Sequence, residues 1–230
     1  MKQKSALILF LILLNVNSFS QVSDDINKTD KNGMKQGHWI KKYPNGHVQY
    51  DAWFKDNQPF GTFNRYFEND TLHSVLVFSK DGKEATASIY HPNGYIASKG
   101  KFTNQLKEGN WQFFSDKSRG YLVQEEEYSA NKRNGVSLKY YPDKSPLEKI
   151  TYVNDVRSGE WIQYFQNGIA CLRGNYLNGK LNGSFLIFFE NGKPEYIGLY
   201  KEDTRHGTWK RYNADGILKD SIDYKSGVAQ

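Results

Sequence analysis

The side chains with the widest chemical repertoire in this sequence are five histidines and one cysteine, and their spacing matches no catalytic or metal-binding pattern. Metal sites and nucleophilic sites need several such groups placed so that they converge. Cys171 has no second cysteine as a disulfide partner, so we expect an inert, partly buried thiol. No paired spacing links the histidines, and we expect solvated surface positions for the two that flank repeat glycines, His38 and His206; the others are His47, His73 and His91.

The densest acidic run is Glu125, Glu126 and Glu127, which stands directly before Tyr128 and could suggest a cation site. We interpret this run instead as solvated charge. The sequence also has no glycine-rich phosphate loop that leads into a helix. These patterns predict a protein that is not an enzyme and has no catalytic residues, no metal and no cofactor.

A regular row of aromatic side chains is the best candidate for a partner-binding surface, because large exposed aromatic patches usually mark contacts with partners. The alternative is that these rings are only the packing that the protein's own repeats require. The row consists of Tyr66, Tyr90, Phe114, Tyr140, Tyr164, Phe188 and Tyr212.

Basic residues recur near this row and would suit an anionic partner, such as a lipid head group or an acidic glycan. They are spread over four repeats and predict a weak patch; they are Lys41, Lys42, Arg65, Lys139, Lys210 and Arg211. The formal net charge of the chain is +6. Such a small excess, with both signs of charge interspersed, does not predict nucleic-acid binding.

The aromatic and basic residues recur because the sequence contains an internal repeat of about 24 residues. A glycine followed two residues later by a large aromatic marks six unit starts, and Ala85 and Gly135 complete the series. The starts are residues 37, 61, 85, 109, 135, 159, 183 and 207, with a two-residue insertion in the fourth unit that we place within residues 115–120. Seventeen residues after each start, allowing for that insertion, stands an aromatic: Phe54, Phe78, Phe102, Tyr128, Tyr152, Tyr176, Tyr200 and Tyr224.

Tight turns separate the aromatic columns. Asn167-Gly168 lies eight and nine residues into its unit, and we expect a type I′ turn there and at the equivalent pairs, because both central residues of that turn need positive φ. A second turn follows the later aromatic column, as at Asn178-Gly179. Each unit is therefore a β-hairpin, and loops this short join antiparallel neighbours.

The predicted fold is all-β: an elongated antiparallel meander of about eight 24-residue hairpin units over residues 32–227. Aromatic side chains fall on both faces of the predicted sheet, since side chains alternate along a strand. This favours a sheet that is mostly a single layer. We expect a linker at residues 21–31 and a short tail at 228–230.

The N-terminus has the pattern of a secretory signal peptide at residues 1–20. Lys2 and Lys4 precede an apolar run from Ala6 to Leu14, and a stretch rich in small residues ends at Ser20. Nine apolar residues are too few to span a bilayer as a helix, which needs about 20. We therefore expect export to the periplasm or the extracellular space, with no transmembrane span in the mature chain.

The fullest unit resembles the MORN-repeat variant of bacterial proteins that are often labelled antitoxin-like, of the YwqK type. The resemblance is carried by Gly159-Glu160-Trp161-Ile162-Gln163-Tyr164-Phe165-Gln166-Asn167-Gly168 and by Tyr176-Leu177-Asn178-Gly179-Lys180-Leu181-Asn182-Gly183. It covers about residues 32–227 and implies a β-hairpin array that contacts proteins or phospholipids. The departures from the family's pattern are the unit at Ala85, Ser137 in the tryptophan position, and Asn69-Asp70 and Asp143-Lys144 at the first turn.

Together these features predict an exported, non-enzymatic repeat scaffold that mediates protein–protein interaction at the cell envelope. Two alternatives remain open: a module that binds envelope phospholipid or glycan, and an antitoxin-like partner of a toxin protein.

Overall fold

The computed structural model describes residues 25–117 and 120–230, and the predicted signal peptide lies outside these residues. The described residues form one antiparallel sheet of nineteen strands and contain no helix, which confirms the predicted all-β meander. The strands are β1 (Lys28–Thr29), β2 (Lys35–Lys42), β3 (Val48–Lys55), β4 (Gln58–Tyr66), β5 (Leu72–Phe78), β6 (Glu84–Tyr90), β7 (Ile96–Thr103), β8 (Leu106–Phe114), β9 (Leu122–Ser129), β10 (Lys132–Tyr140), β11 (Pro146–Val153), β12 (Val156–Tyr164), β13 (Ala170–Leu177), β14 (Lys180–Leu181), β15 (Gly183–Phe188), β16 (Pro194–Lys201), β17 (Thr204–Tyr212), β18 (Leu218–Lys225) and β19 (Val228–Ala229).

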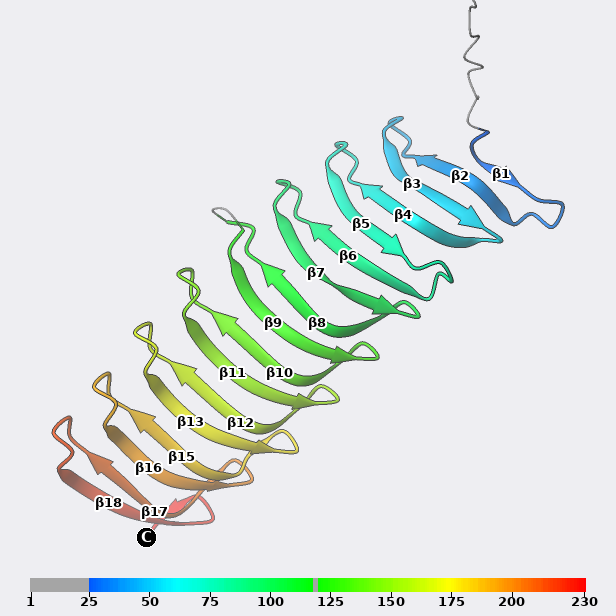
Figure 1. The fold of residues 1–230 in the computed structure, drawn as a ribbon. Helices are drawn as coiled ribbons and strands as arrows, with labels where there is room; N and C mark the ends of the chain where they lie inside the picture. The colour runs from blue at the N-terminus through cyan, green and yellow to red at the C-terminus, as the bar shows by residue number, and fades with distance from the viewer. Residues whose placement is uncertain (1–24, 118–119) are drawn as a thin grey trace, which may run out of the picture.

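Each strand pairs with its neighbours in sequence, so the chain advances hairpin by hairpin along one long, open sheet (Figure 1). β14 and β15 are two parts of one strand position, and both pair with β13. At the first end, β1 pairs with β2 and comes from the segment predicted as a linker. At the other end, β19 comes from the predicted tail and pairs with β18 through only two residues.

The first turn of each unit differs from the predicted type I′ turn. Gly46 donates its N–H to the carbonyl of Tyr43 (3.0 Å), and Tyr43 donates to His47 (2.8 Å), so the loop has three residues. Gly46 has a φ of 88°, whereas the preceding Asn45 is not among the residues with positive φ. This is a type I turn followed by one left-handed residue. The side-chain oxygen of Asn45 stabilises the loop by accepting a hydrogen bond from the N–H of His47 at 3.0 Å.

Type I′ turns occupy the second turn instead. The pair Asn154 and Asp155 has φ of 48° and 69°, and the pair Asn178 and Gly179 has φ of 52° and 84°. The chain then forms a β-bulge at the glycine that starts the next unit, as at Gly109, whose φ of 66° an L side chain rarely adopts. The bulge that follows each two-residue turn therefore explains why a glycine recurs at the unit start.

The third unit shows what happens without that glycine. Ala85 stands at the start position, and the ladder between β5 and β6 runs without a register shift. The extra residue moves into the turn, where Ser79 donates its N–H to the carbonyl of Glu84 across a longer loop. Alanine resists the left-handed conformation that the bulge needs, so the unit keeps its length but changes its loop.

The insertion in the fourth unit lies where the sequence placed it. β8 ends at Phe114, and the N–H of Ser115 donates to the carbonyl of Tyr121 at 2.9 Å. The longer connection therefore falls at the first turn of the unit, within residues 115–120, although residues 118–119 lie outside the described part of the chain.

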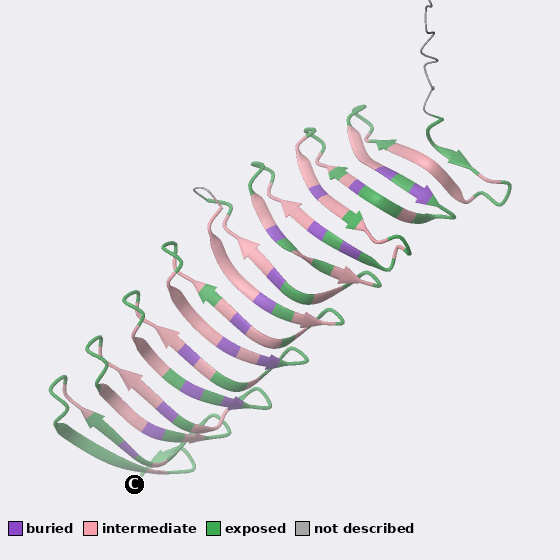
Figure 2. Cartoon of the chain, in the orientation of Figure 1, coloured by how far each residue is buried: buried purple, intermediate pink, exposed green. Residues whose placement is uncertain are grey.

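One face of the sheet, which we call the ladder face, carries the aromatic that stands two residues after six of the eight starts, together with the later aromatic column. Trp39 pairs with Ala52 and Gly37 pairs with Phe54, so these positions share a face. Buried residues recur in strand after strand along the sheet (Figure 2), and Trp111 is the largest side chain that is fully buried. With no second layer on it, this row of rings is the core of the described residues.

The ladder face is packed by pairs of large and small residues across neighbouring strands. A Cβ added to Gly100 would lie 2.2 Å from the ring of Trp111, and a Cβ on Gly198 would lie equally close to Trp209. These glycines are therefore required by contact with a ring. In the third unit the sizes are reversed, because Leu76 pairs with Ala87.

Candidate partner-binding surfaces

The seven aromatic residues predicted as a binding surface lie on the face opposite the ladder, which we call the row face. All seven rings are half-buried. Each pairs across the hairpin with an apolar residue of the following strand. We call these seven pairs the aromatic stripe: Tyr66 with Leu72, Tyr90 with Ile96, Phe114 with Leu122, Tyr140 with Pro146, Tyr164 with Ala170, Phe188 with Pro194 and Tyr212 with Leu218.

The sequence did not reveal that charged side chains of the preceding strand reach across to this stripe. The Lys99 ammonium lies 5.8 Å from the centre of the Phe114 ring, and the Arg173 guanidinium lies 6.0 Å from that of Phe188. The hydroxyl of Tyr140 donates to the carboxylate of Glu125 at 2.6 Å. The centre of the stripe is therefore partly engaged within the array, while its rings remain half-exposed.

On the ladder face the rings contact one another along the sheet. Trp111 lies 4.9 Å from Phe102 and 6.5 Å from Tyr128, measured between ring centres, and both contacts are edge-to-face. Such pairs contribute about 0.5 to 1.5 kcal/mol each beyond simple burial. The two aromatic columns of the ladder face therefore serve chiefly to pack the units of the array against one another.

A column of basic residues two positions before six of the eight starts was missed from the sequence. Five of these six side chains lie over rings of the ladder face. Lys107 is 4.6 Å from the centre of the Trp111 ring, and Arg205 is 4.5 Å from that of Trp209. Desolvation lowers the pKa of Lys107. Aligning the units two residues further upstream would have shown the column, which comprises Lys35, Lys83, Lys107, Arg133, Arg157 and Arg205.

The basic residues singled out from the sequence do not form one patch. Arg65 lies over the ring of Phe63 at 5.6 Å, and Lys139 pairs with Glu148 at 2.7 Å, both on the ladder face. By strand alternation Lys41 and Arg211 share that face, whereas Lys42 and Lys210 fall on the row face. An anionic ligand on either face would meet only some of them.

The acidic run is not uniformly solvated, contrary to expectation. Glu126 is buried, with 7% of its surface exposed, and accepts hydrogen bonds from the Tyr128 hydroxyl (2.6 Å) and from Gln124 (2.9 Å). Ser137, in the tryptophan position across from it, leaves room for this carboxylate. Desolvation and the bond to Glu126 raise the pKa of Tyr128. The run therefore supplies one polar packing group.

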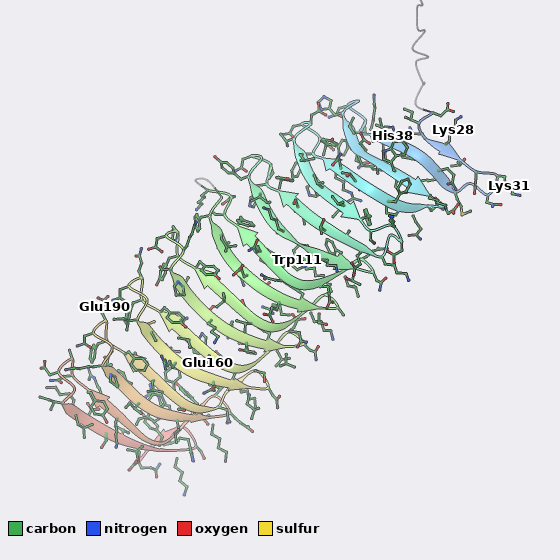
Figure 3. All side chains as sticks on the ribbon, in the orientation of Figure 1. Lys28, Lys31, His38, Trp111, Glu160 and Glu190 are labelled. Atoms are coloured by element: carbon green, nitrogen blue, oxygen red, sulfur yellow. The ribbon has the colours of Figure 1, made fainter. Side chains whose placement is uncertain are left out.

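The remaining candidate residues do not converge. His38 is half-buried on β2, bonds to Asp51 at 2.8 Å and stacks on Trp53 at 4.9 Å, so the expected solvated position is wrong (Figure 3). Cys171 is half-buried on β13, where burial raises the pKa of its thiol. In the part of the chain that the structure describes, no group of three or more His, Cys, Asp or Glu side chains could hold a metal ion. Over the same residues, no helix is long and apolar enough to cross a membrane.

Comparison with known families agrees with this architecture. The MORN repeat variant matches residues 133–154, 181–202 and 205–226. Each match begins two residues before a unit start, at Arg133, Leu181 and Arg205, and so includes the upstream column. MORN repeats commonly bind proteins or membrane lipids. No curated protein matches the chain.

Proposed function

We propose that this chain is a non-enzymatic scaffold that binds a protein partner along the aromatic stripe, and that it acts at the cell envelope after export. The observation that carries the proposal is the stripe itself, in which half-exposed aromatic and aliphatic side chains alternate over seven successive units. Exposed apolar surface on this scale is typical of protein contacts.

The geometry of the stripe indicates what the partner must present. Neighbouring strands lie about 4.8 Å apart, so rings in successive units are about 10 Å apart. A partner that places apolar side chains at that interval can contact several units at once. Many weak contacts in series then add up without any deep pocket.

Export rests on the charged, apolar and small-residue pattern of residues 1–20. It supports action in the periplasm or outside the cell. The histidines and the single cysteine have no catalytic spacing in the sequence, which supports a binding role over catalysis.

A substitution experiment on the stripe tests this proposal. Tyr66, Tyr90 and Tyr164 are changed together to Ala, and Tyr140 is left intact because its hydroxyl bonds to Glu125. Proteins captured from envelope extracts by the wild type should be lost with this variant. The matched control changes the same three residues to Phe, which keeps the rings, and it should capture the same proteins. Equal recovery by the alanine variant would count against the stripe as the contact surface.

A second candidate function is binding of an anionic lipid head group or glycan. The column of basic side chains on the ladder face favours it, since these residues recur at a fixed interval along the array. Sedimentation with phosphatidylglycerol vesicles at about 0.1 M and 0.5 M salt tests it. Electrostatic binding should fall sharply at the higher salt, and binding that is absent at both would remove this candidate.

The antitoxin-like role has the weakest support, because it depends on the likeness of one unit to a bacterial repeat type. It requires a toxin in the same compartment, and the predicted export would separate the chain from a cytoplasmic toxin. Co-purification of a toxin with the exported chain would be the observation in its favour.

A further inference from the structure

The third unit lacks the ring that six of the eight units place on the ladder face two residues after the start. In the fourth unit, Trp111 lies between Phe102 and Tyr128, with Lys107 at 4.6 Å from its ring. One unit earlier the tryptophan position is Ala87. Ring contacts among the described residues accordingly run as far as Phe78 and resume at Phe102.

A hollow of about 180 Å³ opens where this ring would lie, and we call it the third-unit socket. Phe78 and Phe102 correspond to the two rings that flank Trp111, and the socket is lined by Leu76, Phe78, Gly82, Lys83, Ala85 and Phe102, with Gln105 at its edge. Leu76 occupies the position of Gly100, so it fills the space nearest the sheet. The remaining hollow is apolar and open to solvent on the ladder face.

The socket also has the cation that accompanies a tryptophan elsewhere in the array. In the sequence Lys83 stands two residues before the unit start, as Lys35, Lys107 and Arg205 do. Those three lie on strands, whereas Lys83 lies at the end of the turn before β6 and lines the socket from there. Those three cations lie 4.5 to 4.7 Å from the centre of a tryptophan ring in their own unit. Lys83 is exposed, and the carbonyl of its backbone accepts the N–H of Asn104 from the next turn. A cation at this place favours an aromatic face over an aliphatic side chain.

We propose that the third-unit socket binds an aromatic side chain presented by a protein partner. The flanking rings would contact its edges, Leu76 its inner face, and Lys83 its outer face. The socket lies on the face opposite the aromatic stripe, so this inference stands independently of the proposed function.

Titration with N-acetyl-L-tryptophanamide, followed by methyl NMR of the full chain, tests the proposal. The methyl signals of Leu76 and Ala85 should move upfield and saturate, because an aromatic ring would lie against them. N-acetyl-L-leucinamide is the matched probe without a ring, and it should bind several-fold more weakly. Shifts that stay linear up to the solubility limit, or equal affinity for both probes, would overturn the proposal.

Two variants place the binding in the socket. Leu76→Ala combined with Ala87→Phe reproduces the Ala52 and Phe63 pair of the second unit and fills the socket with the chain's own ring, so saturable shifts should vanish. Lys83→Gln removes the charge and leaves a shorter polar side chain, and it should weaken binding about two- to five-fold. Unchanged binding in both variants would show that the probe binds elsewhere and would reject the socket.

Discussion

At the scale of single residues, the backbone conformation of a position decides much of what the sequence can place there. Lys144 holds a φ of 73° at the first turn of its unit, where the next unit has Gly168 with a φ of 83°. A side chain in the left-handed region costs about 1 to 2 kcal/mol. The fifth unit therefore carries a local strain that the sixth avoids.

Replacing Lys144 by Gly should raise the free energy of unfolding by about 0.5 to 1 kcal/mol, because relief of strain exceeds the added entropy of the unfolded chain. The reverse substitution, Gly168→Lys, is the matched control and should lower it by a similar amount. Urea unfolding followed by tyrosine and tryptophan fluorescence measures both. Equal effects of the same sign would contradict the turn assignment.

The hydrogen bond between Tyr140 and Glu125 gives a pH dependence at both extremes. Bonds from Gln112 and Tyr140 lower the pKa of Glu125, so the stability they contribute is present above about pH 4.5 and is lost as pH falls through the lowered pKa. Desolvation and Glu125 raise the pKa of Tyr140 to about 12. That contribution is complete below about pH 10 and is lost as pH rises through about 12.

Tyr140→Phe should accordingly show a smaller loss of stability than the wild type between about pH 10 and pH 12. The same substitution at Tyr164, one unit along the stripe, controls for the general effect of removing a phenol. Urea midpoints at several pH values in this window supply the comparison. If both variants follow the wild-type curve, the bond to Glu125 makes no pH-dependent contribution.

At the residue scale, the sequence predicted where the aromatic residues recur better than it predicted what individual side chains do in the structure. The aromatic columns were identified because they repeat along one chain. The buried state of Glu126 was not, since it depends on Ser137 across a strand pair. The type of the Asn-Gly turns was also wrong, because that dipeptide suits both a two-residue turn and a three-residue loop.

At the scale of strands and hairpins, packing depends on the summed size of two residues from different units. Equivalent places in the sheet are filled in two ways: a small residue precedes a large one in Gly100 and Trp111, and a large residue precedes a small one in Leu76 and Ala87. This explains how the third unit tolerates the loss of its aromatic residue. This exchange of sizes cannot be read from the residue pattern of one unit, because the pairing register between units must be known first.

A double-mutant cycle tests this size exchange. Leu76→Ala alone should destabilise by about 1 to 3 kcal/mol through lost packing, and Ala87→Phe alone by about 1 to 3 kcal/mol through crowding against Leu76. The double variant should be more stable than their sum by about 1 to 2 kcal/mol. Strict additivity in urea unfolding would show that the two residues do not share one space.

At the scale of the whole molecule, the sheet is one layer in which each unit contacts only its neighbours (Figure 1). Stability should then be close to a sum over units and their junctions. The last long strand, β18, pairs with β17 on one side and has only the two-residue β19 on the other. Of its eight residues, all but Tyr224 are exposed.

Hydrogen exchange should therefore be graded along the array. Amides of β18 should exchange fastest, and those of β8 to β12 slowest, because the central strands are paired on both sides along their length. Mass spectrometry of peptides spanning the chain provides the measurement. Uniform exchange would mean that the array opens as one cooperative unit and not as a series.

The overall architecture followed from the sequence because a hairpin array repeats the same local rule in every unit. Gly109 and its equivalents marked the unit starts, and the column at Tyr176 and its equivalents marked the later strands. The binding surfaces did not follow in the same way. Aromatic residues that repeat regularly pack against one another on the ladder face and stay half-exposed on the row face. The sequence alone does not distinguish these two environments, because the pairing register between strands must be known.

A photocrosslinking scan with p-benzoylphenylalanine at three pairs of adjacent positions tests directly whether a partner binds along the aromatic stripe. In each pair one residue lies on the ladder face and the next on the aromatic stripe: Arg65 and Tyr66, Lys139 and Tyr140, and Arg211 and Tyr212. If a partner binds along the stripe, Tyr66, Tyr140 and Tyr212 should yield adducts with one common protein while their neighbours do not. Equal adducts from both members of each pair, or adducts from the ladder-face positions alone, would contradict binding along the stripe.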